Sequence, residues 1–558
     1  MTNIAALAEG LDSPPVRSNP RFFTALPWAA WLAAVVVAAL HMLPVARAVL
    51  VAPEGYTVTG NLSTSPDVMQ YRVWMRQAAE EGPVVSNRFT TEPNRPYLPV
   101  PFYYAIGKVS EASGVSPEWV YVWTGAVFAF LLTLLLFATA RYFLRDRTAT
   151  WTAFVSIVLG GGLGGYLLMI IRSPLAYDLA PIHRLITDPL SQPMVTVLDE
   201  LRGDYVISTI FDTHFLLIWL FATVATLSFY RTIRSFSWPS VALTAAAFAA
   251  ATVVHVYEGV TLLAIATSIA LLCWIRNIRR YQVVVVTTAC MIAVGIVFVW
   301  IAALVARGGL PVPPWRGPAI YPTLLFLGFP LAWTLLAWGL ARYWREADLD
   351  RLFLLGWIMG CTLLSLSAPF YPWPNRGMLM LQVPLTIVAA AVWFNGTRRL
   401  DVRAVVVCVL LMGSTPAVQI YQRMQSSSFT EAAPHKFLSP DDRATIAALN
   451  RSAHPDDVLL ADFADRLWLA PDFRGRHYAG HFFLTVDYDR KHAETVELFK
   501  SNAAQAAQFL TRHGIRFIYV NDRRDPAKFR AVPGLVPLHE TRDGVLFEYL
   551  PARSSGQS

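Results

Sequence analysis

Long apolar runs are the feature that most constrains the fold of this chain. A helix needs about 20 mostly apolar residues to cross the hydrocarbon core of a bilayer, and the sequence offers many such runs. Of its 558 residues, 55% are hydrophobic and only 15% are charged. That composition is too apolar for an ordinary soluble protein of this length. The pattern predicts a polytopic α-helical membrane protein.

The apolar runs predict about eleven transmembrane helices. They are placed near residues 23–46, 119–143, 150–171, 207–230, 239–255, 258–275, 282–305, 320–341, 352–368, 377–394 and 403–421. The pair 239–255 and 258–275 leaves two interpretations open, namely two helices or one long kinked passage. The first run is long and lacks an Ala-x-Ala-like cleavage site, so it is expected to be a retained helix and not a signal peptide.

Arginine clusters follow alternate spans and set the expected orientation. They comprise Arg141, Arg145 and Arg147, Arg231 and Arg234, Arg276, Arg279 and Arg280, Arg342, Arg345 and Arg351, and Arg398, Arg399 and Arg403. All fall on one side of an eleven-span arrangement, together with Arg17 and Arg21, and the positive-inside rule makes that side cytoplasmic. The N-terminus is therefore expected inside and the C-terminal segment outside. Topology thus accounts for the net charge of +8, and no nucleic-acid partner is indicated.

Two domains are expected, a transmembrane domain at residues 1–421 and a small extracytoplasmic α/β domain at 422–558. The first contains an outer loop at 51–118, and further outer loops are expected near 172–206, 306–319 and 369–376. At residue 422 the composition changes to frequent Asp, Arg and His.

Short periodic segments predict the secondary structure of the second domain. Residues 458–461 and 517–520 are typical of buried strands. Residues 493–512 are expected to form one helix that ends at Gly514. The tail 551–558 is expected to be disordered.

The four cysteines lie in or at the ends of apolar segments, so no structural disulfide is predicted. They are Cys273, Cys290, Cys361 and Cys408. No Cys-x-x-Cys spacing indicates a metal site.

Asp67 is the leading candidate for a catalytic group. It lies in Ser65-Pro66-Asp67, directly after the first span, where a carboxylate can accept the proton of a substrate hydroxyl. The same letters are typical of a helix start, with the acid favoured by the helix dipole, and they recur at 439–441, where only a cap is expected. The two interpretations are compatible, because a helix start holds an acid rigidly.

Asp212 and His214 lie near the outer end of the fourth predicted span. Ionisable groups at such positions usually face a cavity or the bundle interior. The alternative is a solvated helix end or a packing hydrogen bond.

His255 and Glu258 interrupt an apolar stretch on the same expected side. Three residues apart, they share a helix face if the helix continues. They are candidates to orient each other or to bind substrate hydroxyls, and two ligands are too few to define a metal site. The alternative is a polar turn between two spans.

Arg376 and Arg316 lie on the expected outer side, against the positive-inside bias. A guanidinium offers phosphate a bidentate fork, so Arg376 is the first candidate ligand for a lipid phosphate and Arg316 the second. Either is also compatible with an anchor to anionic headgroups. In the C-terminal domain, Arg476 to His481 are candidates to line the same mouth, with an ordinary surface loop as the alternative.

In these motifs the chain resembles the bacterial membrane glycosyltransferases of the GT-C superfamily. The resemblance is carried by Asn61 to Gly82, Phe211-Asp-Thr-His214, His255-Val-Tyr-Glu258, Pro372 to Arg376 with Leu381 to Pro384, and Tyr478-Ala-Gly-His481 with Thr485. Their order and their common side carry it more than any single motif.

The resemblance implies a GT-C-like enzyme that moves a sugar from a polyprenyl-phosphate-linked donor to a hydroxyl of a glycan or glycolipid acceptor. It maps the base onto Asp67, places Tyr71 in the substrate-binding set and assigns the departing lipid phosphate to Arg376, aided by His481 or Arg316. Many members have two adjacent acids, whereas Val68 follows Asp67 here. The nearest replacements are Asp178 or Asp212. No metal is obligatory for this donor.

The implied location is the plasma (inner) membrane of a bacterium, and Ala- and Arg-rich usage favours such a source. Three other classes remain open. A transporter or flippase of lipid-linked glycans predicts charges deeper in the spans and a repeated half. A scaffold predicts no dependence on Asp67. A glycan ligase or polymerase shares the fold and most of the site.

Overall fold

The computed structural model describes residues 26–60, 62, 66–144, 146–161, 206–310, 325–326, 328–367, 370–371, 376–396, 417–431 and 433–550. Arg316, Asp178 and Cys408, the second predicted outer loop up to residue 205, residues 403–416 of the last predicted span and the tail 551–558 lie outside the described residues.

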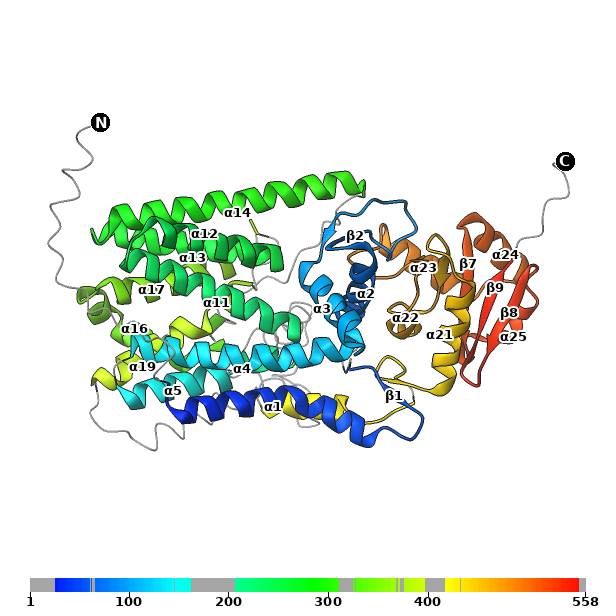
Figure 1. Cartoon of the computed structure of the whole chain (residues 1–558), viewed down its shortest axis with the longest axis horizontal. Helices are drawn as coiled ribbons and strands as arrows, with labels where there is room; N and C mark the ends of the chain where they lie inside the picture. Colours follow the sequence, from blue (N-terminus) through cyan, green and yellow to red (C-terminus); the bar gives the residue numbers. More distant parts are fainter. Residues whose placement is uncertain are drawn as a thin grey trace, which may run out of the picture.

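A bundle of apolar helices forms the larger part of the molecule (Figure 1). Its helices are α1 (Trp28–Val51), α4 (Pro117–Phe143), α5 (Arg147–Leu159), α11 (Thr213–Arg234), α12 (Trp238–Val254), α13 (Val256–Ile275), α14 (Arg280–Gly308), α16 (Pro330–Arg345), α17 (Leu349–Ser365) and α19 (Gln382–Gly396). Among the described helices, α1, α4, α11, α13 and α14 are long and apolar enough to cross a membrane alone. A multi-pass helical membrane protein is therefore the architecture, while the total of eleven spans stays a prediction.

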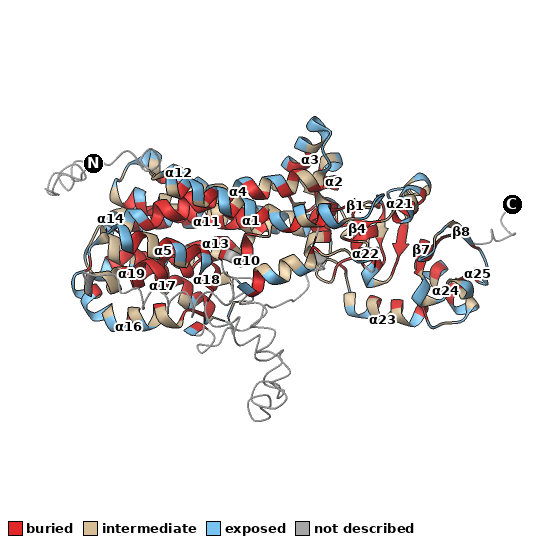
Figure 2. Cartoon of the chain, turned by 90° about the horizontal axis from the view of Figure 1, so that it is seen from below, coloured by how far each residue is buried: buried red, intermediate tan, exposed pale blue. Residues whose placement is uncertain are grey.

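In the bundle, buried residues form a packed interior and exposed residues lie on its outer faces (Figure 2). Trp219 on α11 and Trp357 on α17 are fully buried. In contrast, α14 exposes Ile296 and Val299. A helix that is apolar on its exposed face suits a lipid surface, because lipid tails do not penalise exposed apolar side chains.

The two helices α12 and α13 form a hairpin, which decides between the two interpretations of this segment. Phe236, just before α12, has its ring 6.2 Å from that of Tyr281, in the first turn of α14, which follows α13 after a short turn. At the other end, the connecting residue His255 lies against His214 at the start of α11, with ring centroids 5.6 Å apart. Two separate passages therefore run in opposite directions.

The described arginine clusters gather at one end of the bundle, here called the arginine end. Arg234 after α11 pairs with Asp350 before α17, at 2.9 Å. Arg276 after α13 lies 5.4 Å from the ring of Trp344 on α16. The predicted common side is confirmed for the described clusters after α11, α13 and α16, whereas Arg17, Arg21, Arg145, Arg398, Arg399 and Arg403 lie outside the described residues. The opposite end, where α11 begins, is here called the site end.

Two short helices cover the site end, α2 (Pro66–Glu81) and α3 (Pro101–Ser113), joined through a hairpin of β2 (Val84–Val85) and β3 (Leu98–Pro99). The helix start expected at Ser65-Pro66-Asp67 is confirmed, since α2 begins at Pro66. Gly107 lets α3 approach closely, because a Cβ there would lie 2.5 Å from the carbonyl oxygen of Met75.

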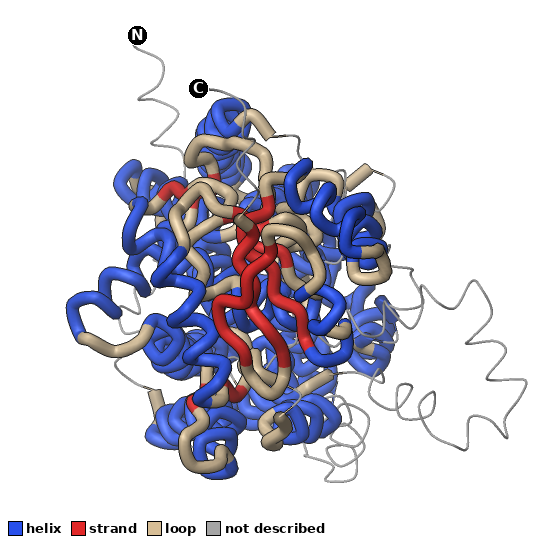
Figure 3. The backbone as a smooth tube through the Cα atoms, turned by 90° about the vertical axis from the view of Figure 1, so that its right-hand side faces the viewer, coloured by secondary structure: helices blue, strands red, loops and turns tan. Residues whose placement is uncertain are grey.

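The C-terminal segment forms a small α/β unit (Figure 3). Its elements are β4 (Phe437–Leu438), α21 (Pro440–Ser452), β5 (Val458–Leu460), α22 (Phe463–Leu469), β6 (Arg476–His477), α23 (Tyr488–Leu498), α24 (Ala503–Arg512), β7 (Ile515–Asn521), a 3-10 turn (Asp522–Arg524), α25 (Pro526–Arg530), β8 (Leu535–Glu540) and β9 (Gly544–Tyr549). The sheet order is β6-β5-β7-β9-β8, with β6 and β7 parallel to β5 and β9 antiparallel to its neighbours. Both predicted strands are confirmed as β5 and part of β7.

The single helix predicted at 493–512 is wrong. Two helices, α23 and α24, occupy this stretch, because Asn502 caps the second one and exchanges hydrogen bonds with Gln505 in a capping box. Gly514 follows α24 in the left-handed region, with φ of +61°. The cap expected at Ser439 is confirmed, in a capping box with Asp442.

The C-terminal unit is tied to the site end of the bundle. β1 (Thr57–Val58), which follows α1, pairs antiparallel with β4. In this short ladder Thr57 pairs with Leu438 and Val58 with Phe437.

Candidate active site

Asp67 lies in the first turn of α2 at the site end, where its side chain is 47% exposed. Its Oδ1 lies 3.3 Å from Nε2 of His481, from the loop after β6. Two residues separated by most of the chain thus meet in one carboxylate–imidazole pair. The carboxylate is reachable from solvent while its partner ring is fully buried.

The hydrogen bonds of His481 fix which ring nitrogen carries the proton. The backbone N–H of Phe483 donates to Nδ1 at 3.1 Å, so Nδ1 is the acceptor. In a neutral imidazole the other nitrogen then carries the hydrogen. Nε2–H therefore donates to Asp67. The partner ring orients the carboxylate.

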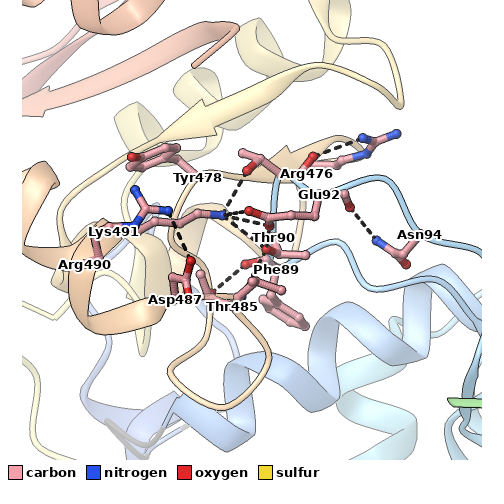
Figure 4. Close-up of polar contacts among 12 residues, drawn as sticks. Phe89, Thr90, Glu92, Asn94, Arg476, Tyr478, Thr485, Asp487, Arg490 and Lys491 are labelled. Carbon is pink, nitrogen blue, oxygen red and sulfur yellow. Dashed lines mark hydrogen bonds and ion pairs between the residues drawn. The ribbon is translucent and has the colours of Figure 1, made fainter. Parts of the chain in front are cut away.

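A polar interface holds the His481 loop on the segment between β2 and β3 (Figure 4). Thr485 Oγ1 accepts from the backbone N–H of His481 at 3.1 Å and donates to the carbonyl of Phe89 at 2.7 Å. Lys491, whose side chain is 3% exposed, binds both carboxylate oxygens of Glu92 at 2.6 and 2.8 Å. Burial opposes ionisation of Glu92, but the hydrogen bonds from Lys491 and Thr90 outweigh it and leave the pKa of Glu92 below its usual value.

Tyr71 lies one helical turn after Asp67 and packs among aromatic rings. It stacks on Tyr103 of α3 at 5.2 Å and lies 4.8 Å from the ring of His214. The hydroxyl of Tyr103 is 3.0 Å from Nδ1 of His214. Burial chiefly, followed by the charges of Asp67 and Asp212, raises the pKa of Tyr71 well above its usual value. Tyr71 is therefore a neutral phenol.

The row of polar rings continues from His214 to Arg376. The ring of His255 lies 5.6 Å from that of His214, and its Nδ1 is 3.5 Å from Oε1 of Glu258. Arg376, which begins α18 (Arg376–Leu379), lies 5.4 Å from the ring of Phe215. It also interacts electrostatically with His214, His255 and Glu258. The arrangement offers an acid at one end and a guanidinium at the other.

Asp212 has a structural task that the sequence left open. It caps α11, since its Oδ1 accepts from the backbone N–H of His214 at 2.9 Å. The hydroxyl of Tyr121 lies 3.5 Å from the same oxygen. Asp212 also interacts electrostatically with Arg423. It therefore contacts a charged group at the site end in addition to capping α11.

Within the described residues, no group of three or more His, Cys, Asp or Glu side chains is arranged to hold a metal ion. Cys273, Cys290 and Cys361 are free and buried.

No protein-family profile and no curated protein sequence matches the chain. Solved structures do match. An oligosaccharyltransferase from Archaeoglobus fulgidus, in a complex with Zn and sulfate, aligns with a TM-score of 0.52 at 10% identity, over 90% of this chain and 69% of its own. The arabinofuranosyltransferase AftD from Mycobacteria aligns with a TM-score of 0.53 at 14% identity, over 95% of this chain but 40% of its own. The chain has the GT-C glycosyltransferase fold. Because the sequence identities are only 10% and 14%, these alignments establish a similarity of fold alone.

In this GT-C fold, the structure gathers the sequence-predicted residues Asp67, Tyr71, Asp212, His214, His255, Glu258, Arg376 and His481 at the site end. The earlier expectation that His481 aids Arg376 on phosphate stays untested, whereas its contact with Asp67 is direct.

The sequence analysis missed several residues of the site end. They are Arg72, Tyr103, Glu118, Tyr121 and Arg423. Glu118 carried a usable signal, because an acid at the start of an apolar span is uncommon and usually functional or paired. It pairs with Arg72 at 3.2 Å and with Arg76 at 2.8 Å. Tyr103 and Tyr121 carried none, since aromatic residues are ordinary at membrane interfaces.

Proposed function

We propose that this protein is a membrane glycosyltransferase that moves a sugar from a polyprenyl-phosphate-linked donor to an acceptor hydroxyl. The observation that carries the proposal is the hydrogen bond from His481 to Asp67, at the same end of a GT-C fold as Arg376. The likeness in fold supports this class of reaction, and the oriented, solvent-reachable carboxylate of Asp67 supports its assignment as the base.

In the proposed reaction, Asp67 accepts the proton of the acceptor hydroxyl while that oxygen attacks the anomeric carbon. The bond between the anomeric carbon and the phosphate oxygen breaks, and the polyprenyl phosphate leaves with the electron pair. The new glycosidic bond and the protonated carboxyl of Asp67 complete the balance. A positioned general base of this kind contributes about 10²–10⁴-fold in rate.

Arg376 is the group that we assign to the departing phosphate. A guanidinium binds phosphate oxygens in a bidentate manner. Nε of Arg376 is buried, and its guanidinium lies 5.4 Å from the ring of Phe215. Stabilising charge that develops on the leaving group in a partly dry site is usually the largest catalytic term.

We further propose that the site end faces away from the cytoplasm and that the N-terminus lies inside, in the plasma membrane of a bacterium. The gathering of the described arginine clusters at the opposite end supports this orientation. Cysteine labelling of spheroplasts at positions in the C-terminal unit tests it.

The decisive experiment compares Asp67→Asn with Asp441→Asn in nanodiscs. Asp441 has the same Ser-Pro-Asp setting at the start of α21 and is exposed, so it is a matched control. The assay measures polyprenyl phosphate released from a panel of synthetic polyprenyl-phosphate mono- and oligosaccharides. Loss of release in Asp67→Asn alone supports the proposal, and the donor size accepted separates a transferase from a ligase or polymerase.

A transporter or flippase gives the opposite pattern. Translocation of a fluorescent polyprenyl-phosphate sugar across proteoliposomes would proceed without release of polyprenyl phosphate and would be unchanged in Asp67→Asn. That result would replace the transferase by a transport function.

A further inference from the structure

The C-terminal unit contains a buried cation that its described neighbours leave unpaired. Arg466, on α22, is 2% exposed. None of its three guanidinium nitrogens forms a hydrogen bond with the residues that the structure describes. A guanidinium is always charged, and a buried charge without a hydrogen-bonded partner is energetically unfavourable. Arg466 therefore needs an acceptor that the described part of the chain does not supply.

Two histidines of the same unit also have buried ring nitrogens without a described partner. His477, in β6, is 1% exposed, and this holds for both its Nδ1 and its Nε2. It holds for Nδ1 of His492, on α23, as well. Arg466 acts electrostatically on His477, so the unsatisfied guanidinium and the unsatisfied imidazole are neighbours.

Tyr488, at the start of α23, connects Arg466 with His492. Its hydroxyl interacts with Arg466, although without the geometry of a regular hydrogen bond. Its ring stacks on that of His492, with centroids 5.6 Å apart. These four residues, Arg466, His477, Tyr488 and His492, are here called the Arg466 cluster. They come from three separate elements, so the packing of the unit brings them together.

The surroundings of the cluster are largely aromatic. The guanidinium of Arg466 lies 5.5 Å from the ring of Phe463. The ring of His477 lies 5.4 Å from that of Phe473 and 6.2 Å from that of Phe89. A ring face attracts a cation weakly but carries no net charge. A water molecule would satisfy a donor without balancing the charge of Arg466.

The two carboxylates that act electrostatically on Arg466 are engaged by other groups. Asp462 accepts hydrogen bonds from Arg524 at 2.7 and 2.9 Å. Asp465 accepts from Asn521 at 2.8 Å. The charge of Arg466 thus has counter-charges in its vicinity but no hydrogen-bonded anion among the described residues.

The chemistry of the cluster fits an anion with a single negative charge. Arg88, the other cation that acts on His477, is bound to Glu81 at 2.7 Å, which leaves Arg466 as the charge to be matched. A guanidinium fork binds two oxygens of one carboxylate or phosphate group. A neutral histidine donates one further hydrogen bond.

We propose that the Arg466 cluster is a binding site for a small monovalent oxyanion, namely a carboxylate or a phosphodiester group. The anion would accept hydrogen bonds from Arg466 and from a ring nitrogen of His477. This site is separate from the proposed transfer reaction, and its test measures the stability of the C-terminal unit, so its outcome is independent of catalysis.

The test uses pulse proteolysis in urea of the full-length protein in nanodiscs, read with a C-terminal tag. The probes are sodium acetate and sodium dimethyl phosphate, each compared with sodium chloride at equal concentration in Tris chloride at about pH 7.5. Arg466→Met replaces the cation by an apolar side chain of similar length. Its matched control, Arg474→Met, makes the same change at an exposed position of the same unit. Arg466→Lys keeps the charge but removes the fork.

We expect at least one probe to lower the unfolding equilibrium constant of the wild type by about tenfold at about ten times its Kd. The effect should be absent in Arg466→Met, smaller in Arg466→Lys, and complete in Arg474→Met and Arg376→Gln. In chloride alone, Arg466→Met should be at least as stable as the wild type, because replacing a buried unpaired charge by an apolar side chain is neutral or stabilising.

The composition of the nanodisc identifies the source of the anion. If phosphatidylglycerol stabilises the wild type without an added probe, and phosphatidylcholine does not, a lipid headgroup supplies the phosphodiester. If only the free probes act, the ligand is a free ion. Both results support the site.

Three outcomes would overturn the inference. Chloride could stabilise the wild type as much as either probe does, which would indicate an effect of ionic strength. The response to the probes could persist in full in both Arg466→Met and Arg466→Lys. In chloride, Arg466→Met could be strongly destabilised or fail to fold while Arg466→Lys gives no response to either probe, which would assign Arg466 a structural role without an anion.

Discussion

The two ends of the bundle carry similar charged residues in different surroundings. At the arginine end, Arg234 and Asp350 pair at 2.9 Å with side chains 36% and 37% exposed. At the site end, Arg72 and Glu118 pair at 3.2 Å with side chains only 4% and 7% exposed. The first pair is therefore partly exposed, and the second is buried.

The difference shows what each end contributes. An exposed ion pair stabilises a protein by about 0–1 kcal/mol, so the arginine end needs charge for orientation more than for packing. A buried pair carries a desolvation cost that its attraction only partly offsets. The site end retains such pairs beside a solvent-reachable acid, which is expected of a binding site. Five predictions sharpen or break this contrast, from the largest expected effect to the smallest.

Asp67→Asn should lower transfer by about 10³-fold, because an amide cannot accept the acceptor proton. Release of polyprenyl phosphate from the donor panel measures it, at matched amounts of folded protein. Full activity in this variant, with Asp441→Asn also active, would remove Asp67 from the mechanism and leave the site end without its base.

Arg376→Gln should weaken undecaprenyl phosphate binding by about 10²-fold, since a charge-assisted bidentate contact is lost. Titration in nanodiscs by tryptophan quenching measures it. Arg376→Lys should restore part of the affinity but not the fork geometry. Unchanged binding in Arg376→Gln would move the phosphate elsewhere at the site end.

His477 in β6 should make the C-terminal unit less stable in acid. Burial chiefly, with the charges of Arg466 and Arg88, lowers the pKa of His477 to about 3. Its unfolded-state pKa is about 6.5, so between these values only the unfolded chain binds the proton. Stability is therefore complete above about pH 6.5 and falls as the pH drops toward 3.

The expected loss from His477 between pH 7 and pH 5 is roughly 2 kcal/mol. Pulse proteolysis of the full-length protein in urea, read with a C-terminal tag, measures it at both pH values. His477→Phe fits between the rings of Phe89 and Phe473 and should flatten the dependence. A slope equal to that of the wild type would place the titration on another group.

His481→Phe should lower the turnover rate about tenfold with little change in donor affinity, because a positioning hydrogen bond to Asp67 is lost. His481→Gln, whose amide can donate the same hydrogen bond, should recover most of the turnover rate, which discriminates this role from a purely structural one. Equal losses of turnover in His481→Phe and His481→Gln would reduce His481 to a packing residue.

Arg234→Gln at the arginine end should change stability by less than about 0.5 kcal/mol and leave transfer unchanged. Thermal unfolding in detergent and the release assay measure the two quantities. An activity loss comparable with that of Arg376→Gln would erase the contrast between the ends.

Much of the architecture was predictable from the sequence because membranes impose simple rules. Long apolar runs located the helices from α1 to α19, and the arginine clusters predicted one common end, since lipid and charge act on local composition. The start of α2 at Pro66 followed from cap chemistry. The break between α23 and α24 was missed, because the Asn502 capping box was not weighed against the apolar period of 493–512.

The site was predictable only in part. Isolated polar residues within apolar surroundings pointed to Asp212, His214, His255 and Glu258. The contact between Asp67 and His481 was not predictable, because it spans 414 positions and depends on the loop after β6 docking beside Phe89. The pocket lined by Arg72 and Arg423 depends in the same way on segments that no local pattern connects.

By itself, the sequence determined a multi-span apolar bundle, the common end of its arginines, and a set of polar residues whose exposure to lipid would be energetically unfavourable. Those properties are local, since hydropathy and capping depend on neighbours a few residues apart. Only the tertiary structure decided that β1 pairs with β4 and that His481 meets Asp67. It also decided that the ring of Tyr71 packs against that of His214. Such contacts arise from the packing of distant segments around shared cores, which no short-range pattern encodes.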